Sequence, residues 1–405
     1  MGVDELDYDK TLVEVGASSV YAYVRRTAEE SREGVCWQTF SFANEPQYVT
    51  NAFNGVAGIT LFLSGYGRMF PDSEAHELSR KALQWCSMPN RRLRQDFPDA
   101  SDASLMFGWA GIGMAWLRYY QASQDSDALE GIARMVTAAL AAEPGADATL
   151  NKGLAGQGIF LLRAYEELGR DELIGAAQAI GRRLLEMAVR EGPDVRWQTF
   201  VGGLAEPVYF LGLGRGSAGI GHLFLELHRT TGESLWADMA TECAQTVLRH
   251  ARKDRGGLGW PLQFGDEDLT DCRWCLGAPG AGWFLVRAYE QTDEAEYLEA
   301  AESVGRAVVT YGDVRRNPSQ CHGLAGSAGF LIELYRITGK SEWVEQAFTL
   351  SEQIFTYRKV TLDGDEWQAD EPDLHSPEFM CGASGTGYCF LQLLDPQTVS
   401  VPLIA

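Results

Sequence analysis

Basic residues are scarce in this sequence. The 405 residues include 34 lysines and arginines against 56 aspartates and glutamates, which gives a formal net charge of −22. A surface this acidic disfavours contact with phosphate backbones or anionic membranes, so we expect no nucleic-acid partner. The same charge suits a basic or neutral peptide partner, although a high net charge is also a common means of keeping a protein in solution.

Long apolar runs are missing as well. No stretch of 18 apolar residues exists to span a bilayer, which argues against an integral membrane protein. The opening segment MGVDELDYDK has neither a basic start nor an apolar core, so it does not resemble a signal peptide. We therefore expect a cytoplasmic protein whose eight cysteines are core, metal-binding or reactive residues rather than disulfides.

One pattern recurs seven times along the chain: Gly-x-x-Gly, usually with a third small residue two places on, followed by an apolar helix. The copies run from Gly55 to Gly382 in six steps, so one unit has roughly 54 residues, and such a period marks a repeat architecture. The first glycines are Gly55, Gly108, Gly153, Gly216, Gly277, Gly323 and Gly382.

Each unit contains two helices of different character. The helix after the glycines, such as GIFLLRAY from Gly158, is apolar on nearly all sides and is therefore expected to be buried. A short break and an amphipathic helix follow, such as DELIGAAQAIGRRLLEMA from Asp171, with acidic residues in its first turn. Each unit thus predicts an inner and an outer helix.

The two ends of the sequence predict a closed ring. The seventh unit stops after its inner helix at Leu394, while residues 9–30 predict an outer helix without an inner partner. An open solenoid would need polar caps at both ends, and none is evident. We expect one all-α domain over residues 1–405, an α/α toroid of seven inner and seven outer helices. In it, residues 1–45 close the ring and residues 46–405 carry the seven motifs.

Aromatic, strand-like segments lie in the longer connections. Three of them share a Trp-Gln pair, at Trp37, Trp197 and Trp367, which suggests equivalent loops. Short hairpins are one interpretation, because aromatic and β-branched residues favour strands. Loops anchored by a buried tryptophan are the other, and the sequence alone does not separate them.

All inner helices of such a ring run the same way, so the loops before them converge at one mouth. The fifth and sixth units carry Cys275 and Cys321 two positions before the first glycine. The residues directly before that glycine are Asn54, Phe107, Lys152, Arg215, Leu276, His322 and Cys381. We expect these positions to face a shared site.

Cys275, Cys321 and His322 together suit zinc. Two thiolates and an imidazole are typical zinc ligands, and three protein ligands leave the fourth position open, as in catalytic sites. Cys272 forms a Cys-x-x-Cys with Cys275, but no second such pair exists for a zinc ribbon, so we treat it as non-ligating. Cys381 is either a fourth ligand, which would close the site, or a small cavity-lining residue that contacts substrate.

The motifs WCLGAPG (Trp274–Gly280) and CHGLAG (Cys321–Gly326) resemble the signatures of LanC-like proteins, the family of lanthipeptide cyclases. The seven glycine motifs extend this resemblance over nearly the whole chain. It implies an α/α toroid with one Zn²⁺ on Cys275, Cys321 and His322. It also implies Michael addition of a peptide cysteine thiol to dehydroalanine or dehydrobutyrine, giving a thioether ring. The partner would be a dehydrated precursor peptide, with kinase, lyase or other modifying enzymes acting beside the cyclase.

Three cations are expected near this site: Arg215 and Arg273 are candidates for stabilising the enolate that such an addition forms, and Lys152 is a candidate for binding the substrate. Arg215 stands where many family members have an acid/base histidine; arginine stays protonated, so it suits a clamp better than a proton shuttle. Lys152 lies in the neighbouring loop as a second cavity cation. Arg273 is either catalytic or a structural partner of Asp271 or Asp266.

Three further residues complete the expected site. His222 is a candidate acid/base in place of the missing histidine, or else a helix-face residue of the core. Asp147 aligns loosely with a family aspartate before the third motif. Leu276 occupies a position that often carries an aromatic residue or histidine in the family, and we assign it to substrate binding.

Two other functions keep the same fold. A LanC-like enzyme could add glutathione or another thiol to dehydroamino acids, and a non-catalytic protein could hold a peptide for a separate enzyme of a peptide-modifying complex. The altered positions Arg215 and Leu276 motivate the scaffold. A toroid glycosidase fits poorly, because the positions before the glycines offer no paired carboxylates.

Overall fold

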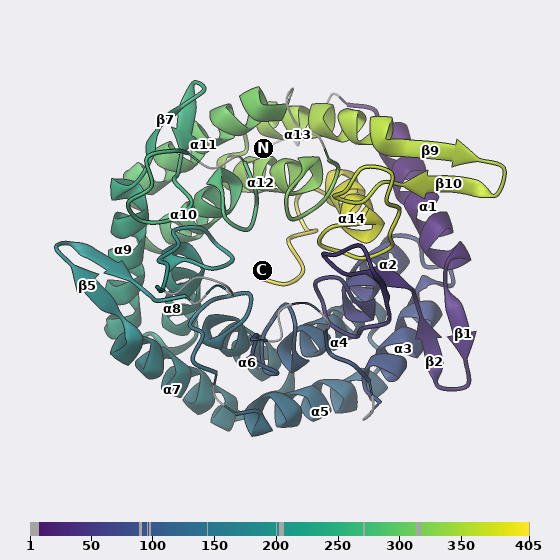
Figure 1. Cartoon of the computed structure of the whole chain (residues 1–405), viewed down its shortest axis with the longest axis horizontal. Helices are drawn as coiled ribbons and strands as arrows, with labels where there is room; N and C mark the ends of the chain where they lie inside the picture. Colours follow the sequence, from purple (N-terminus) through teal and green to yellow (C-terminus); the bar gives the residue numbers. More distant parts are fainter. Residues whose placement is uncertain are drawn as a thin grey trace.

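The computed structural model describes residues 8–88, 91–94, 96, 99–143, 145–199, 201, 206–269, 272–312 and 317–404. Within these residues, fourteen α-helices form two concentric layers (Figure 1). The inner layer consists of α2 (Val56–Met69), α4 (Trp109–Ser123), α6 (Leu154–Leu168), α8 (Ser217–Thr231), α10 (Ala278–Thr292), α12 (Leu324–Thr338) and α14 (Ala383–Leu394).

The outer layer alternates with the inner one along the chain. Its helices are α1 (Lys10–Arg26), α3 (Ala75–Cys86), α5 (Asp127–Ala141), α7 (Asp171–Met187), α9 (Ser234–Arg249), α11 (Ala295–Gly312) and α13 (Ser341–Ile354). A 3-10 turn, η1 (Phe355–Tyr357), follows α13. Because α1 packs against α14 and α14 packs against α2, the first and last helices complete the ring. The predicted toroid of seven inner and seven outer helices is confirmed.

The two layers differ in burial as their sequence patterns predict. Every residue of α8 from Ser217 to Leu227 is buried, whereas α9 buries one face that includes Trp236 and Cys243. Neighbouring inner helices pack very closely: a Cβ atom at Gly221 would lie only 2.5 Å from the ring of Phe284. Only glycine allows this approach. No helix within the described residues combines the length and apolar character needed to cross a bilayer.

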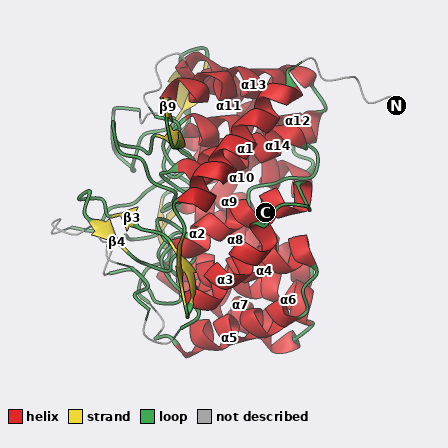
Figure 2. Cartoon of the chain, turned by 90° about the vertical axis from the view of Figure 1, so that its right-hand side faces the viewer, coloured by secondary structure: helices red, strands yellow, loops and turns green. Residues whose placement is uncertain are grey.

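Five two-stranded antiparallel hairpins lie among the described connections, and Figure 2 shows the strands and long loops gathered at one end of the ring. They pair β1 (Glu29–Ser31) with β2 (Gly34–Cys36), β3 (Thr39–Phe40) with β4 (Pro46–Gln47), β5 (Val189–Glu191) with β6 (Asp194–Arg196), β7 (Arg252–Asp254) with β8 (Gly257–Gly259), and β9 (Arg358–Thr361) with β10 (Gly364–Trp367).

A buried tryptophan ties several hairpins to the outer helix before them. Trp37, Trp197 and Trp260 each donate the indole N–H over 2.7 Å to a backbone carbonyl 13 residues earlier, near the end of α1, α7 or α9. Trp367 differs and donates to the Ser19 hydroxyl at 3.2 Å. These bonds satisfy both a buried indole and, in three cases, a helix-end carbonyl. Both interpretations of the Trp-Gln segments are therefore correct, because hairpins and anchored loops occur together.

The segment after α14 turns into the centre of the ring, where Figure 1 marks the C-terminal end. Its side chains Val399, Val401, Leu403 and Ile404 are buried. Inner-helix arginines bind its backbone: the Arg118 Nε–H and the Arg336 Nε–H each donate over 2.6 Å, to the carbonyls of Pro402 and Pro396. We call residues 395–404 the C-terminal tail. It lies inside the ring, between the halves of the inner helices that lie far from the loops, and a cavity remains between the tail and those helices.

Candidate metal centre

The seven loops that precede the inner helices are joined to one another by backbone hydrogen bonds. In each loop the bonding residues lie two or three positions before the first glycine. The N–H···O=C bonds, of 2.6–3.1 Å, run from Ala52 to Met106, Met106 to Asn151, Asn151 to Gly214, Gly214 to Cys275, Trp274 to Cys321, Cys321 to Met380 and Met380 to Phe53. We call this closed circle the loop belt. Since buried peptide groups need partners, the belt fixes each loop relative to its neighbours.

The second glycine of each motif lets the inner helix begin directly beneath the loop belt. A Cβ atom at Gly280 would lie 2.0 Å from the carbonyl oxygen of Trp274, and one at Gly326 would lie 2.1 Å from that of Gln320. These carbonyls belong to the peptide groups that lead into Cys275 and Cys321. A side chain at either glycine would therefore displace a cysteine of the predicted metal group.

Cys275, Cys321 and His322 come together in the belt. One ligand atom of each lies within 4.8 Å of those of the other two, although 46 residues separate the cysteines. Ligands of a tetrahedral zinc ion lie roughly 3.3–3.8 Å apart, given bonds of about 2.0–2.3 Å, so small adjustments would close the group around one ion. Two buried thiols, both free of disulfides, and one imidazole fit zinc by their chemistry.

The three groups also perturb one another's protonation. Hydrogen bonding with Cys321 holds the pKa of the Cys275 thiol well below its usual value, against the opposing effect of burial. Burial raises the pKa of Cys321. Burial would lower the pKa of His322, but its hydrogen bonds with Asp370 and Cys275 outweigh this effect and raise the pKa to about 10. The group therefore already favours a thiolate, the form that binds a metal.

Asp370 is a member of the site that the sequence analysis missed. Its carboxylate accepts a hydrogen bond from Nδ1 of His322, and its backbone N–H donates to the Cys381 carbonyl at 2.8 Å. A carboxylate on one imidazole nitrogen fixes the tautomer and leaves Nε2 for a metal. Asp370 follows β10, outside the glycine motifs, so the repeat register gave no signal for it. The only signal was its place three residues after Trp367.

Cys381 lies beside the metal group and not within it. It forms a second cluster with His322 and Asp370, in which the ligand atoms again lie within 4.8 Å of one another. It does not join Cys275 and Cys321 in one four-membered group, and no other described residue does. Of the two interpretations of Cys381, this placement supports a cavity-lining thiol. The group thus offers three of the four ligands that a tetrahedral ion takes, and its His322 also lines a neighbouring cavity.

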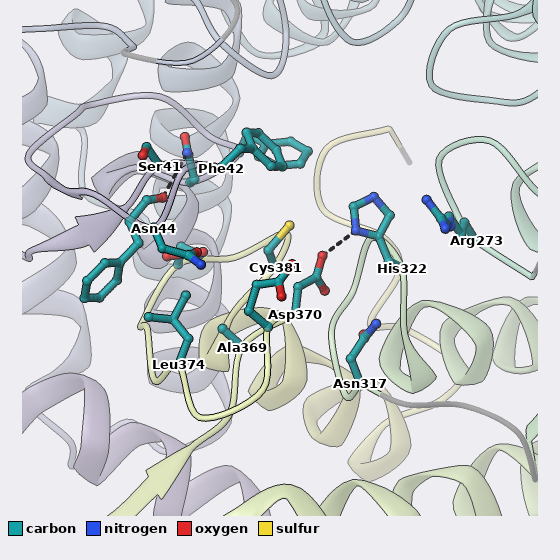
Figure 3. A pocket seen from close by; sticks show the side chains of 15 residues that line it. Ser41, Phe42, Asn44, Arg273, Asn317, His322, Ala369, Asp370, Leu374 and Cys381 are labelled. Atoms are coloured by element: carbon teal, nitrogen blue, oxygen red, sulfur yellow. Dashed lines mark hydrogen bonds and ion pairs between the residues drawn. The ribbon is translucent and has the colours of Figure 1, made fainter.

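A cavity of about 330 Å³ opens next to His322 at the loop end of the ring. Figure 3 shows Asp370 and Cys381 on one side of His322 and Arg273 on the other. The β3–β4 hairpin supplies an aromatic wall through Phe40 and Phe42. Phe53, Asn54, Asn317 and Glu378 also line this cavity. An apolar wall facing a few convergent polar groups is typical of a binding site for a small or flexible ligand.

The three candidate cations have different surroundings. Arg215 is half-buried, and its charge is close enough to Cys275 to favour the thiolate. Lys152 is 3% exposed and donates from Nζ to Asp99 at 2.9 Å; burial lowers its pKa. Arg273 is exposed at the cavity, and its candidate partner Asp271 lies outside the described residues. Arg215 and Arg273 thus lie near the metal group, while Lys152 is engaged in an ion pair.

The other candidates have mainly local or distant contacts. Asp147 accepts the Thr149 N–H at 2.7 Å, which caps its own loop, and Leu276 is half-buried. His222 lines a different cavity together with residues of the C-terminal tail, and its Nε2 lies 3.0 Å from the Ile404 carbonyl. Burial lowers the pKa of His222 to about 4. This placement matches the core alternative for His222; the roles of Asp147 and Leu276 stay predictions.

Comparisons with known proteins agree with this architecture. A family model described as lanthionine synthetase C-like protein matches residues 50–404. Nisin cyclase aligns over 98% of this chain and 96% of its own, with a TM-score of 0.66 and 16% identity. A GH76 α-mannanase of Bacteroides thetaiotaomicron aligns over 95% and 98%, with a TM-score of 0.53 and 10% identity. A sugar epimerase from a ruminal bacterium aligns over 95% and 98%, with a TM-score of 0.50 and 12% identity. No curated protein matches the chain by sequence. The structural likenesses show a shared toroid fold.

Proposed function

Since the chain belongs to the lanthionine synthetase C-like family, we propose that it is a zinc-dependent lanthipeptide cyclase. The reaction joins a cysteine thiol of a dehydrated precursor peptide to dehydroalanine or dehydrobutyrine of the same peptide and forms a thioether. One observation carries the proposal: Cys275, Cys321 and His322 meet at the loop belt with a cavity beside them. A structural zinc site would be closed by a fourth protein ligand, and this group has three.

The residues present would hold zinc through the sulfurs of Cys275 and Cys321 and through Nε2 of His322, with Asp370 bonded to Nδ1. When bound, zinc lowers the pKa of a coordinated thiol and keeps it as the nucleophilic thiolate at neutral pH. His322 lines the cavity, so a peptide cysteine bound there would lie beside the residues that would hold zinc.

Addition of the thiolate to the β-carbon places negative charge on the oxygen of the dehydroamino acid. The nearby guanidinium groups of Arg215 and Arg273 are suited to stabilise this enolate, because fixed charges act strongly where water is excluded. An arginine that stays protonated does not supply the proton that the α-carbon then needs. Another group of the cavity must do so.

The cavity also suits a peptide that enters from the loop end. Phe40 and Phe42 offer apolar surface to side chains, and the C-terminal tail lies across the opposite half of the ring beside a second cavity. The net charge of −22 favours encounter with a neutral or basic peptide. We therefore expect the substrate to enter and leave through the same mouth.

The test is to incubate the zinc-loaded protein with a dehydrated, cysteine-containing peptide and to count free thiols by alkylation. Loss of thiols at unchanged peptide mass, absent from a chelator-treated control, is expected for a cyclase. A mass gain that requires glutathione would point to the thiol-addition enzyme. Tight peptide binding with all thiols retained would overturn the proposal in favour of a scaffold for separate kinase or lyase enzymes.

A further inference from the structure

The position four residues before the first glycine has a local role in several repeat units. The Asn51 Oδ1 accepts the N–H groups of Phe53 and Asn54, both at 2.9 Å. In the third and sixth units, the hydroxyls of Thr149 and Ser319 each accept, at 3.2 Å, the N–H of the residue three places on. Such short polar side chains stabilise the turn on which they lie. The residues at this position are Asn51, Ser104, Thr149, Gly212, Arg273, Ser319 and Glu378.

Three units depart from this small, polar pattern: the fourth has Gly212, and the other two have long charged side chains that line one cavity. The fifth unit has Arg273 and the seventh has Glu378, and both side chains line the cavity beside His322. Arginine has no acceptor atom with which to cap a turn. Two long charged side chains thus lie at equivalent positions of nearby loops and line one cavity, where they can serve a ligand in addition to any local bond.

Glu378 is withdrawn from water although it lines the cavity. The residue is 4% exposed, and its carboxyl group accepts hydrogen bonds from the Ser376 hydroxyl and from the backbone N–H groups of Phe40 and Glu378 itself. The titratable groups that face it are Asp370, Cys381 and Tyr23. Burial and the negative charge of Asp370 outweigh these hydrogen bonds and raise the pKa of Glu378 to about 8. The protonated form is therefore favoured near neutral pH.

We propose that Glu378 is the catalytic acid that protonates the α-carbon of the enolate, and this inference rests on the cyclase function proposed above. The cysteine sulfur forms the C–S bond at the β-carbon, and the electron pair of the C=C bond moves into the enolate. The O–H bond of Glu378 then breaks as the C–H bond at the α-carbon forms. The proton lost by the substrate thiol restores the acid, so thiol and alkene become thioether with no further reagent.

Three other ionisable groups are less suited to this step. His222 lines a different cavity at the C-terminal tail, and Arg215 keeps its proton. Asp370 is bonded to His322 and so serves the metal group. Glu378 combines burial, a place in the cavity wall and a neutral carboxyl group, the combination by which enzymes keep an acid protonated at neutral pH.

The experiment compares wild type with Glu378→Gln, which removes the acid at nearly constant shape. We expect the cyclisation rate to fall about 10²–10⁴-fold, the usual contribution of a positioned acid, with zinc content and peptide affinity unchanged. Residual product should contain two diastereomers at the α-carbon, because the proton then arrives from water on either face. Chiral gas chromatography of hydrolysed lanthionine measures this ratio, which a purely structural role would not change.

Glu378→Asp keeps the acid on a shorter side chain and should recover part of the rate and the single diastereomer. Glu352→Gln, an exposed change of the same chemistry on α13, is the matched control and should behave like wild type. A folded Glu378→Gln variant with the wild-type rate and one diastereomer would overturn the inference. So would equal rate losses for Glu378→Gln and Glu378→Asp, since the shorter acid would then rescue nothing. Wild type that retains every thiol would instead defeat the cyclase function itself.

Discussion

The two ends of the helical ring treat ionisable side chains in opposite ways. At the loop end, two cysteines, His322 and Glu378 are buried or half-buried around a cavity, with positions left open for a ligand. At the tail end, charged residues of the inner helices are paired with one another. The same repeat therefore builds one end with a cluster of candidate metal ligands and another end with paired charges.

Ion pairs at the tail end follow the repeat register ten residues after the first glycine. Arg163 pairs with Glu226 at 2.7 Å, and Arg287 pairs with Glu333, which is fully buried. A buried charge is tolerated only when it is paired in this way. The C-terminal tail occupies the remaining space and takes up further donors, including Arg118 and Arg336.

Burial alone does not identify a functional residue in this ring. His222 and Glu378 are both buried and both have shifted pKa values. His222 is bonded to the Ile404 carbonyl and lines a cavity beside the tail, whereas Glu378 lines the cavity that His322 of the candidate metal group also lines. Substitutions at the loop end should therefore change zinc binding and activity, whereas substitutions at the tail end should change the free energy of unfolding. Four predictions test this difference.

The largest effect is expected for Cys321→Ala. The variant keeps only Cys275 and His322, and a catalytic zinc site needs three protein ligands. It should therefore lose stoichiometric zinc and all thioether formation. Zinc per chain is measured by elemental analysis after dialysis, and thioether formation by thiol alkylation.

Cys381→Ala is the matched control for that change, because Cys381 is a buried cysteine of the neighbouring loop that lies outside the Cys275–Cys321–His322 group. It should retain one zinc per chain. Loss of zinc from this variant would mean that Cys381 is a fourth ligand and that the site is closed.

At the tail end, Leu403→Ala should destabilise the protein without altering zinc content. Leu403 is 1% exposed within the ring, and truncating a buried leucine costs about 2–5 kcal/mol. Urea unfolding followed by circular dichroism measures the loss. Leu362→Ala makes the same chemical change at a fully exposed position of the β9–β10 hairpin and should cost less than about 0.5 kcal/mol. Equal stability of the two variants would contradict the role of the tail.

The sequence predicted the features that recur at fixed positions of the repeat, namely the two helix layers and the three candidate metal ligands. Cys275, Cys321 and His322 occupy equivalent positions in two adjacent units, so their convergence follows from the ring geometry, and the helices follow from apolar periodicity. Asp370 and the C-terminal tail lie outside the glycine motifs, and their contacts depend on tertiary packing that no periodicity encodes. Glu378 was visible as a departure from the pattern at its position, but only the cavity gives that departure a meaning.

The buried imidazole of His222 should make the stability of the tail end depend on pH. Burial lowers the pKa of His222 to about 4 from its usual 6.5, so the unfolded chain binds a proton before the folded chain does. The stabilisation is complete above the unfolded pKa and is lost as the pH falls toward 4. When the pH falls from roughly 7.5 to 4.5, the free energy of unfolding of His222→Gln should therefore decrease by about 2–3 kcal/mol less than that of wild type.

Urea titrations at the two pH values measure this difference. His228→Gln, on the same helix but not buried, should keep the wild-type dependence. A wild-type slope for His222→Gln would show that other groups cause the acid sensitivity.

The smallest effect is expected at the loop end, from Asp370→Asn. An amide cannot carry the negative charge that holds the Nδ1–H of His322, so the imidazole would be a weaker and less well oriented ligand. Zinc affinity, measured by competition with a chromophoric chelator, should fall about 10–100-fold, a loss of about 1.4–2.7 kcal/mol. Asp373→Asn makes the same change at an exposed position of the same loop and should bind zinc as wild type does. The unfolding temperature should stay nearly unchanged in both variants. If Asp370→Asn instead lowers the unfolding temperature and leaves zinc affinity unchanged, this carboxylate has a structural role, like the ion pairs of the tail end, and does not support the metal group.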